Sequence, residues 1–326
     1  MSQNLLFSFS MPDAIPIVDI CSSTSAVDDL TIATLLNAAL SQFGFCYISG
    51  HAITTEVTKN LINSAREFHL LPISEKKSLK INSYHRGYIE SESSQTITSS
   101  IESATQPNRS ESFMVMREIP PSDPRFGSQL FGPNQWPDTL IPELKRHCTA
   151  YAEAMEKLSL ELVQRLGVAL GLGPNTLLDL FNDPTYFLRL IKYPCLDPND
   201  SPAPFGSAPH TDHGFMTLVL QDDTGGLEVL NSNGQWMPVS PIPDTLVLNV
   251  ADMLSIISNG RWKSTPHRVI LGPQSRQSTA FFFDPDFNAQ INPLVEVRDF
   301  DNRWNPIRYG DYILERFGQN YQYRRK

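Results

Sequence analysis

The first half of the chain carries apolar residues at helical spacing in three segments. The first helix is expected within residues 25–44, where a Ser-x-x-Asp capping box precedes the apolar positions and a glycine follows them. A second helix is expected over residues 55–71, ending before a proline. The third spans about 137–171, and its apolar stripe predicts core packing. Residues 82–112 are rich in Ser, Glu and Thr without periodicity, which predicts a long surface loop or lid.

After residue 180 the pattern changes to short apolar stretches separated by turn sequences such as Asn-Ser-Asn-Gly. Together with one stretch in the first half, those expected to form strands are 45–48, 187–193, 216–221, 226–230, 245–249, 267–271 and 279–284. Many short strands in one half predict a barrel or a double-sheet jelly roll. Helices followed by strands also fit two domains. No linker separates the halves, so we expect one compact α+β unit, residues 1–326.

The composition narrows the classes of partner. The 26 Lys and Arg against 35 Asp and Glu give a net charge of −9, and the longest basic run is the Arg-Arg-Lys tail, so no nucleic-acid partner is expected. No stretch approaches the ~18 apolar residues of a membrane span, and the N-terminus does not resemble a signal peptide. Four scattered cysteines without a Cys-x-x-Cys pair fit a reducing compartment. We therefore expect a cytoplasmic monomer.

Two histidines and an aspartate form a candidate metal site. His210 and Asp212 precede an apolar strand, and in an extended segment residues two apart point to the same face. His267 begins another predicted strand. A His-x-Asp pair alone is weak evidence, because a single histidine on a strand is more often a hydrogen-bonded core residue. Two imidazoles and one carboxylate that leave other coordination positions open are, however, the donor set of non-haem Fe(II) oxygenases. His213 is expected to face away from Asp212, and His85, like the other histidines of the helical half, to be structural or exposed.

With these residues in view, nearly the whole chain resembles the superfamily of isopenicillin N synthase and the plant-type 2-oxoglutarate/Fe(II) oxygenases. The matching segments are 15–19, 43–51, 86–88, 111–113, 193–194, 210–212, 221–227, 248–252, 258–260, 267–269 and 276–278. The resemblance implies a double-stranded β-helix, a distorted jelly roll, wrapped by helices with iron at one open end. It implies a family-type N-terminal region over 12–130 and a jelly-roll core over 181–290.

The resemblance also implies that Arg276 and Ser278 hold a carboxylate. The arginine fork matches a carboxylate, the serine adds a donor, and strand alternation places both on one face. Tyr193 matches a family tyrosine that donates to the same or a neighbouring carboxylate. Many 2-oxoglutarate users carry Asn two residues before that tyrosine, where this chain has Ile191. In isopenicillin N synthase the Arg-x-Ser pair binds the substrate's own carboxylate, so these residues alone do not identify the co-substrate.

The activity implied by the family is that of a 2-oxoglutarate- and Fe(II)-dependent dioxygenase. Such an enzyme uses O2 to oxidise an unactivated C–H bond of a small, specialised metabolite and releases succinate and CO2. Hydroxylation is the expected outcome, with desaturation, cyclisation and ring expansion as related ones. The alternative is a non-haem iron oxidase of the isopenicillin N synthase type, without 2-oxoglutarate. A non-catalytic binding protein would leave the metal triad unexplained, and a zinc hydrolase would leave the Arg-x-Ser pair without a role.

Strand alternation also predicts the residues that face the substrate. Counting from Arg276, it places Phe282 and Asp284 on the inner face near the open end, and counting from Tyr193 it turns Arg189 inward. A charge inside a barrel must be paired or reach water. Arg189 and Asp284 are therefore expected either to pair with each other or to contact polar groups of the substrate. Phe282 supplies an aromatic wall in both cases.

Overall fold

The computed structural model describes residues 14–21, 26–94, 107–200, 204–296 and 305–324. The strands of its larger sheet are β1 (Ile17–Asp19), β2 (Phe45–Ser49), β3 (Gly87–Ile89), β4 (Glu111–Met116), β5 (Pro184–Tyr193), β7 (Met216–Gln221), β10 (Leu246–Val250) and β12 (Arg276–Asp286). The smaller sheet contains β6 (Phe205–His210), β8 (Leu227–Leu230), β9 (Trp236–Pro238) and β11 (His267–Ile270), while β13 (Gln290–Ile291) pairs with β14 (Ile307–Arg308).

The strand order is β1-β2-β10-β7-β12-β5-β4-β3 in the larger sheet and β6-β11-β8-β9 in the smaller one. Apart from the parallel pair β1 and β2, neighbouring strands of both sheets are antiparallel. A cavity lined by both sheets lies between them. The expected jelly-roll core is confirmed.

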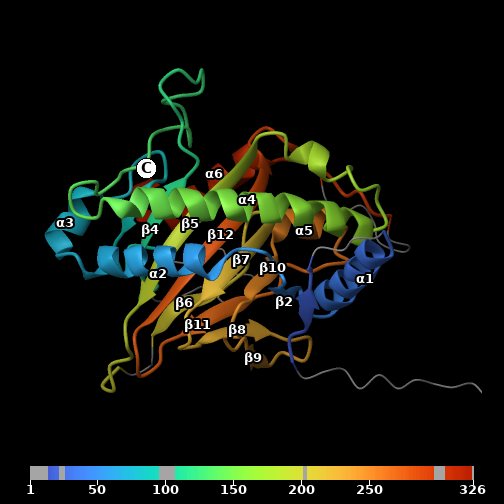
Figure 1. Cartoon of the computed structure of the whole chain (residues 1–326), viewed down its shortest axis with the longest axis horizontal. Helices are drawn as coiled ribbons and strands as arrows, with labels where there is room; N and C mark the ends of the chain where they lie inside the picture. Colours follow the sequence, from blue (N-terminus) through green and yellow to red (C-terminus); the bar gives the residue numbers. More distant parts are fainter. Residues whose placement is uncertain (1–13, 22–25, 95–106, 201–203, 297–304, 325–326) are drawn as a thin grey trace, which may run out of the picture.

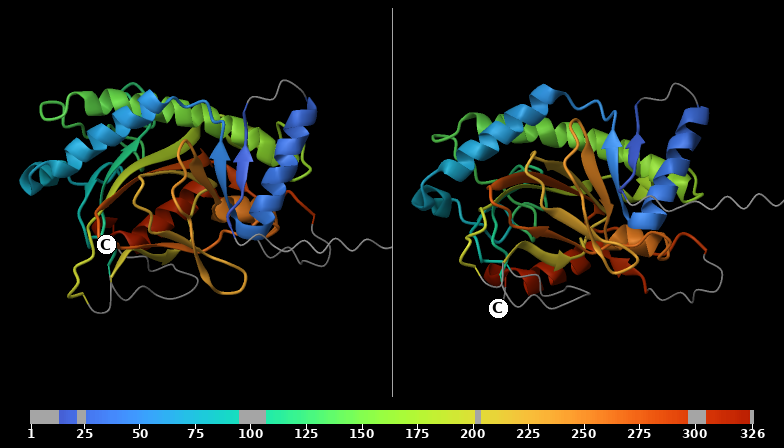
Figure 2. Two further views of the ribbon diagram at one scale, coloured as in Figure 1. Left: turned by 60° about the horizontal axis from the view of Figure 1, so that its bottom comes forward. Right: turned by 90° about the horizontal axis from the view of Figure 1, so that it is seen from below.

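The described helices are α1 (Ala26–Phe43), α2 (Thr55–Leu70), α3 (Ile73–Ser78), α4 (Glu143–Ala169), α5 (Asp252–Ile257) and α6 (Tyr309–Asn320), with short 3-10 turns at η1 (Leu178–Leu180) and η2 (Gln322–Arg324). Helices α1 and α2 pack on α4, and together they cover one face of the larger sheet (Figure 1). Helix α6 lies on the opposite side of that sheet (Figure 2). None of the described helices is both long and apolar enough to cross a membrane.

The long helix α4 shows how its sequence determines both its position and its length. Its buried stripe includes Leu144, Tyr151, Leu158 and Leu162, which are spaced by whole helical turns and face the core. The helix begins at Glu143, later than predicted, because Pro142 occupies the N-cap position. Proline fits the start of a helix but disrupts the interior, so the segment before it forms turns.

One prediction for the first half is wrong in part. The segment 82–112 is not a continuous surface loop, because residues 87–89 form β3 and residue 111 begins β4. All three residues of β3 are buried and their side chains do not alternate between apolar and polar, so the period-two signal of a strand is absent. Residues 95–106 of this segment lie outside the described residues, as does the expected helix cap at Ser25.

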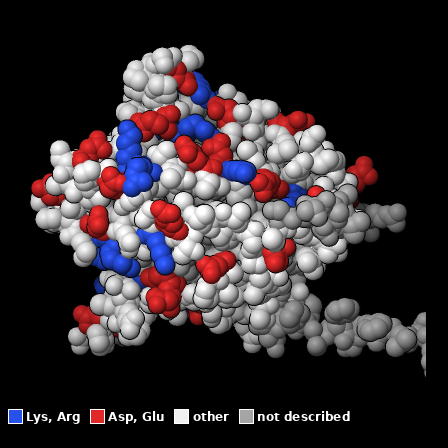
Figure 3. Space-filling view, in the orientation of Figure 1, with Lys and Arg blue, Asp and Glu red and all other residues white. Residues whose placement is uncertain are grey.

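Lys and Arg side chains are interspersed with Asp and Glu over the face formed by α2 and α4 (Figure 3). Beneath it, a largely buried polar cluster centred on Glu111 ties β4 to its neighbours. Its Oε2 accepts hydrogen bonds from Lys76 Nζ at 2.7 Å and from the Tyr88 hydroxyl at 2.6 Å. His69 Nδ1 and Lys192 Nζ each lie 3.5 Å from Oε1. Burial opposes ionisation of Glu111, but the contacts from His69, Lys76 and Tyr88 outweigh it and hold its pKa well below its usual value.

We predict that Glu111→Gln lowers the free energy of unfolding at pH 7 by about 1.5–3 kcal/mol, because charge-assisted hydrogen bonds are lost. Since the folded-state pKa is depressed, the carboxylate stabilises the fold above the unfolded pKa near 4.5 and loses this effect as the pH falls below it. Urea unfolding would measure the free energy of unfolding of both proteins at pH 7 and at lower pH. The difference between the variant and the parent protein should become smaller as the pH falls. Glu90→Gln is the control, since its exposed pair with Lys77 should contribute less than about 1 kcal/mol. A pH-independent difference would contradict this account.

Candidate functional site

Two imidazoles and a carboxylate converge at one end of the cavity between the sheets. His210 ends β6 and His267 begins β11, and the two are register partners on adjacent antiparallel strands. Their ring centroids are therefore only 4.3 Å apart. Asp212 follows β6, and its Oδ1 lies 3.7 Å from His210 Nε2 and 3.6 Å from His267 Nε2. The three ligand atoms lie within 4.8 Å of one another, a spacing that a single metal ion can bridge.

Backbone carbonyls orient both imidazoles. His210 Nδ1 lies 2.7 Å from the Ala208 carbonyl oxygen, and His267 Nδ1 lies 3.2 Å from the Thr265 carbonyl oxygen. A donor hydrogen on Nδ1 leaves the Nε2 lone pair free for a metal. Burial, together with the neighbouring His267, lowers the pKa of His210 to about 4, so the ring is neutral near pH 7. Neutral imidazole is the form that coordinates a metal.

The two carboxylate oxygens of Asp212 make different contacts. Oδ2 accepts hydrogen bonds from Thr217 Oγ1 at 2.5 Å and from Asn249 Nδ2 at 2.8 Å. These two donors face each other on the paired strands β7 and β10. Burial by itself would raise the pKa of Asp212, but the two nearby histidines and these hydrogen bonds hold it below its usual value. The carboxylate therefore stays ionised, with Oδ1 directed toward the imidazoles.

The same cavity, which we call the lumen cavity, contains a buried arginine. Arg276 Nη2 donates to Gln221 Oε1 at 3.1 Å, and its guanidinium carbon lies 4.9 Å from the centroid of the Tyr193 ring. Its Nε and Nη1 are buried and have no hydrogen-bond partner within the described part of the chain. Unpartnered donors on a buried cation are costly, so this site fits an anionic ligand. Ser278 and Tyr193, which the resemblance implies in carboxylate binding, line the same cavity as Arg276.

The strand register confirms the predicted inward faces. On β12 and β5, Arg276 pairs with Tyr193, Ser278 with Ile191, Ala280 with Arg189 and Phe282 with Phe187. All of these except Phe187 line the lumen cavity, so alternation predicted the facing side correctly. Ile191, at the position where the family resemblance implied Asn, presents an apolar side chain to the lumen cavity.

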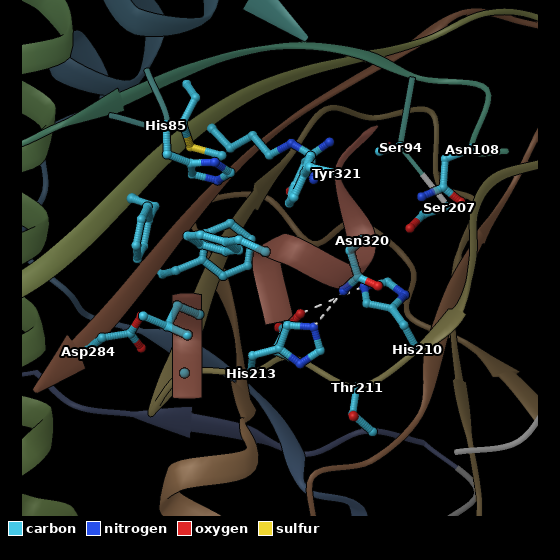
Figure 4. A pocket seen from close by; sticks show the side chains of 18 residues that line it. His85, Ser94, Asn108, Ser207, His210, Thr211, His213, Asp284, Asn320 and Tyr321 are labelled. Atoms are coloured by element: carbon cyan, nitrogen blue, oxygen red, sulfur yellow. Dashed lines mark hydrogen bonds and ion pairs between the residues drawn. The ribbon is translucent and has the colours of Figure 1, made fainter. Parts of the chain in front are cut away.

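A second hollow, which we call the outer pocket, adjoins the lumen cavity. The two share Arg189, Ser207, His210, Asp212 and Phe282. Figure 4 shows His210, His213, Asp284 and Asn320 around the outer pocket. Helix α6 and the residue after it add wall residues that the sequence analysis did not identify, namely Ile313, Phe317, Asn320 and Tyr321.

Arg189 and Asp284 do not pair with each other, so that alternative was wrong. Asp284 Oδ2 accepts from the Tyr309 hydroxyl at 2.6 Å and Oδ1 accepts from the Phe215 backbone N–H at 2.7 Å. Burial raises the pKa of Asp284 to about 7. Gly214 permits this approach, because a Cβ there would lie 1.8 Å from Asp284 Oδ1. Asp284 thus links α6 to the loop that contains Asp212.

His213 also fastens this loop. Its side chain, expected to face away from Asp212, lines the outer pocket. Its Nε2 lies 3.0 Å from Asn320 Nδ2 (Figure 4). Its Nδ1 lies 3.4 Å from Asp252 Oδ2. His213 is not among the three side chains whose ligand atoms converge. His85, expected to be structural or exposed, is fully buried and stacks on Phe317 with ring centroids 3.9 Å apart.

The supporting residues were harder to predict than the ligands. Thr217, Asn249 and Gln221 hold Asp212 and Arg276 in place, and the sequence analysis assigned them no role. One signal was available, because Asn249 is the single polar residue in the apolar strand β10. A buried polar residue requires a hydrogen-bond partner.

Two family models cover most of the chain. Residues 184–285 match the model described as the 2OG-Fe(II) oxygenase superfamily. Residues 15–139 match the model described as non-haem dioxygenase in morphine synthesis N-terminal.

Similar proteins agree with these matches. The chain is 35% identical over 302 residues to a 2-oxoglutarate-dependent dioxygenase of Monascus ruber, covering 88% of each chain. It is 34% identical over 298 residues to a homoarginine-6-hydroxylase of Arabidopsis thaliana, covering 86% of this chain and 87% of the other. A full-length Neurospora crassa protein crystallised with α-ketoglutarate and thymine superposes with a TM-score of 0.81 at 25% identity, covering 94% of this chain and 96% of that one. The chain therefore belongs to the 2OG-Fe(II) oxygenase superfamily and is an Fe(II)- and 2-oxoglutarate-dependent dioxygenase.

Proposed function

We propose that this dioxygenase oxidises an unactivated C–H bond of a small metabolite that binds in the outer pocket. One observation carries the proposal: a convergent group of metal-binding atoms and a buried arginine with two unpartnered donors line the same cavity. The adjoining outer pocket shares two of the metal-binding residues, so a substrate there lies next to the metal.

In this proposal His210, Asp212 and His267 bind Fe(II). The histidines present Nε2, and the aspartate presents Oδ1 while Thr217 and Asn249 hold its other oxygen. Bound iron, with 2-oxoglutarate and O2, supplies the oxidising power for C–H cleavage and yields succinate and CO2. Three protein ligands leave positions open for the co-substrate and O2.

Arg276, Ser278 and Tyr193 are proposed to bind the distal carboxylate of 2-oxoglutarate. The unpartnered Nε and Nη1 of Arg276 offer donors to carboxylate oxygens, and Gln221 holds the remaining side of the guanidinium. The oxidase alternative is not favoured, because similar proteins are named 2-oxoglutarate-dependent dioxygenases. Ile191 supplies an apolar contact in place of the family's Asn.

Arg189, Phe282 and Asp284 are proposed to border the substrate in the outer pocket. The reaction outcome then depends on which C–H bond these walls hold near the iron, a matter of positioning. We propose hydroxylation as the default, in keeping with the name of the Arabidopsis relative, with desaturation, cyclisation and ring expansion as related outcomes. The thymine in complex with the Neurospora crassa protein supports a small-molecule substrate.

We further propose that residues 1–326 work as one unit, with the region 12–130 supporting the catalytic core 181–290. Helix α2, in the first of these regions, packs on α4 and on the core strand β5, which supports this proposal. We propose a cytoplasmic monomer without nucleic-acid or membrane partners, in keeping with the net charge of −9 and four free cysteines.

We predict that His210→Ala, Asp212→Ala and His267→Ala each abolish turnover, because two protein ligands hold the iron too weakly. Folding should survive, since these residues are not part of the apolar core. Succinate release and an anaerobic Fe(II) titration followed by visible absorption would measure both effects. His51→Ala, outside the site, serves as the control. Full activity in any purified, iron-supplemented single variant would refute the ligand assignment.

We predict that Arg276→Lys keeps the charge but loses the fork, so the affinity for 2-oxoglutarate falls by about 10- to 150-fold, the equivalent of about 1.5–3 kcal/mol. Anaerobic titration of the Fe(II) protein with 2-oxoglutarate would measure this change. Arg268→Lys, which alters an arginine paired with Glu228 on β11, is the matched control. If Arg276→Ala leaves 2-oxoglutarate binding unchanged and weakens substrate binding, the oxidase alternative is correct.

We predict that Phe282→Ala reduces substrate turnover while leaving uncoupled 2-oxoglutarate consumption largely intact, because it removes a wall of the outer pocket. Asp284→Ala should lower both activities, because it also releases the Phe215 N–H and the loop that carries Asp212. Parallel assays of succinate and oxidised product would separate the two patterns. An equal loss of both activities in Phe282→Ala would contradict its placement in the substrate site.

A further inference from the structure

We propose that the substrate of this enzyme is an organic acid whose carboxylate pairs with Arg189 and whose body is a flat, largely apolar ring system. This inference rests on the proposed function, because it identifies the outer pocket as the substrate site. It goes further by naming the chemical class that the pocket selects.

The first argument is the uncompensated charge of Arg189. Within the described part of the chain, its only hydrogen bond is from Nε to Ser112 Oγ at 2.9 Å, and no acidic side chain forms an ion pair with it. The residue is partly buried and borders both the outer pocket and the lumen cavity. A cation held away from bulk water is stabilised when an anion joins it, so a ligand carboxylate is the complementary group.

The carboxylate side chains that line the outer pocket already interact with other protein groups. Both oxygens of Asp284 accept hydrogen bonds, from Phe215 and Tyr309. Asp212 directs Oδ1 toward the metal-binding histidines. Among the described residues that line the outer pocket, no carboxylate therefore competes with a substrate carboxylate at Arg189.

The second argument is the orientation of the guanidinium. Ser112 is fully buried on β4, and its hydroxyl holds the Nε side of Arg189. This contact leaves Nη1 and Nη2, the end of the fork that binds a carboxylate through two parallel hydrogen bonds. We therefore assign Ser112 as a positioning residue for Arg189. Its neighbour Glu111 belongs to the separate polar cluster with Lys76 and Tyr88.

The third argument is the shape of the remaining wall. Phe187, Phe282 and Phe317 come from β5, β12 and α6 and line the outer pocket, with Met114 and Ile313 adding apolar surface. The rings of Phe187 and Phe317 stand nearly perpendicular at a centroid distance of 5.5 Å. Aromatic walls of this kind favour planar ring systems.

These features also place the reacting carbon. Arg189 and Phe282 both lie where the outer pocket joins the lumen cavity, together with His210 and Asp212. A carboxylate fixed at Arg189 therefore anchors one end of the substrate, while its ring rests on Phe282 beside the metal-binding residues. Such anchoring restricts the set of C–H bonds that reach the iron.

The test uses matched pairs of probes that differ in charge alone: benzoate, 4-methylbenzoate, phenylacetate and cinnamate, each with its primary amide. Binding to the Fe(II)- and 2-oxoglutarate-loaded protein under argon is measured by calorimetry. At least one acid should bind more tightly than its amide. Arg189→Gln should weaken binding of that acid by about 10- to 150-fold, the effect of a lost charge-assisted hydrogen bond, and leave its amide unchanged. Arg189→Lys, which keeps the charge without the fork, should give an intermediate loss.

Two controls isolate the effect. Lys192→Gln also removes one positive charge from β5, but Lys192 Nζ lies 3.5 Å from Glu111 Oε1 and not in the outer pocket. This variant should therefore still bind the acid more tightly than its amide. Ser112→Ala should reduce that preference, and Ser112→Thr, which restores a hydroxyl, should recover it. A merely structural role for Ser112 would instead lower the affinities for acid and amide together.

The inference is overturned if no acid of the panel binds in preference to its amide, or if Arg189→Gln weakens both members of a pair equally. Titration of the same samples with 2-oxoglutarate tests the proposed function separately, since that binding depends on Arg276. Loss of 2-oxoglutarate binding in the parent protein would defeat the proposed function. Intact 2-oxoglutarate binding without acid preference would defeat this inference alone.

Discussion

The site depends on how the carboxylate of Asp212 is divided between the fold and the metal. One oxygen is held by Thr217 and Asn249, which face each other on paired strands of the larger sheet. The other oxygen faces His210 and His267, which face each other on paired strands of the smaller sheet. A single short side chain thus connects the two sheets, and its position fixes where a metal can bind. Because Thr217, Asn249, His210 and His267 all lie on β-strands, the two sheets determine the position of the carboxylate between them.

Two arginines with different surroundings line the cavities beside the metal-binding residues. Arg276 is fully enclosed and held by Gln221, whereas Arg189 lies at the junction of the two cavities and is held by Ser112. In both cases one neutral side chain fixes the guanidinium without neutralising it. The charge therefore stays available to a ligand, and the neutral partner determines which donors point into the cavity.

Periodicity and spacing predicted much of this arrangement. The His-x-Asp spacing brought two ligands to one face, and alternation along β12 and β5 placed Arg276, Phe282 and Arg189 inward. The sequence did not reveal contacts between distant segments. Asp284 pairs with Tyr309 on a helix that was not predicted, and Ser112 lies on a strand without an alternating pattern. Such partners are fixed by tertiary packing, which a local pattern does not encode.

Helix α6 is held at both ends by polar contacts and presents apolar side chains to the outer pocket between them. Its first residue, Tyr309, bonds to Asp284, and its last, Asn320, lies against His213, so both ends are fastened to the loop that carries the metal-binding aspartate. Between them, Ile313 and Phe317 stand one turn apart on the pocket wall. Mutations at these two central positions can reshape the pocket while the end contacts hold the helix in place. The side chains that shape the pocket are thus separate from the contacts that hold the loop of Asp212.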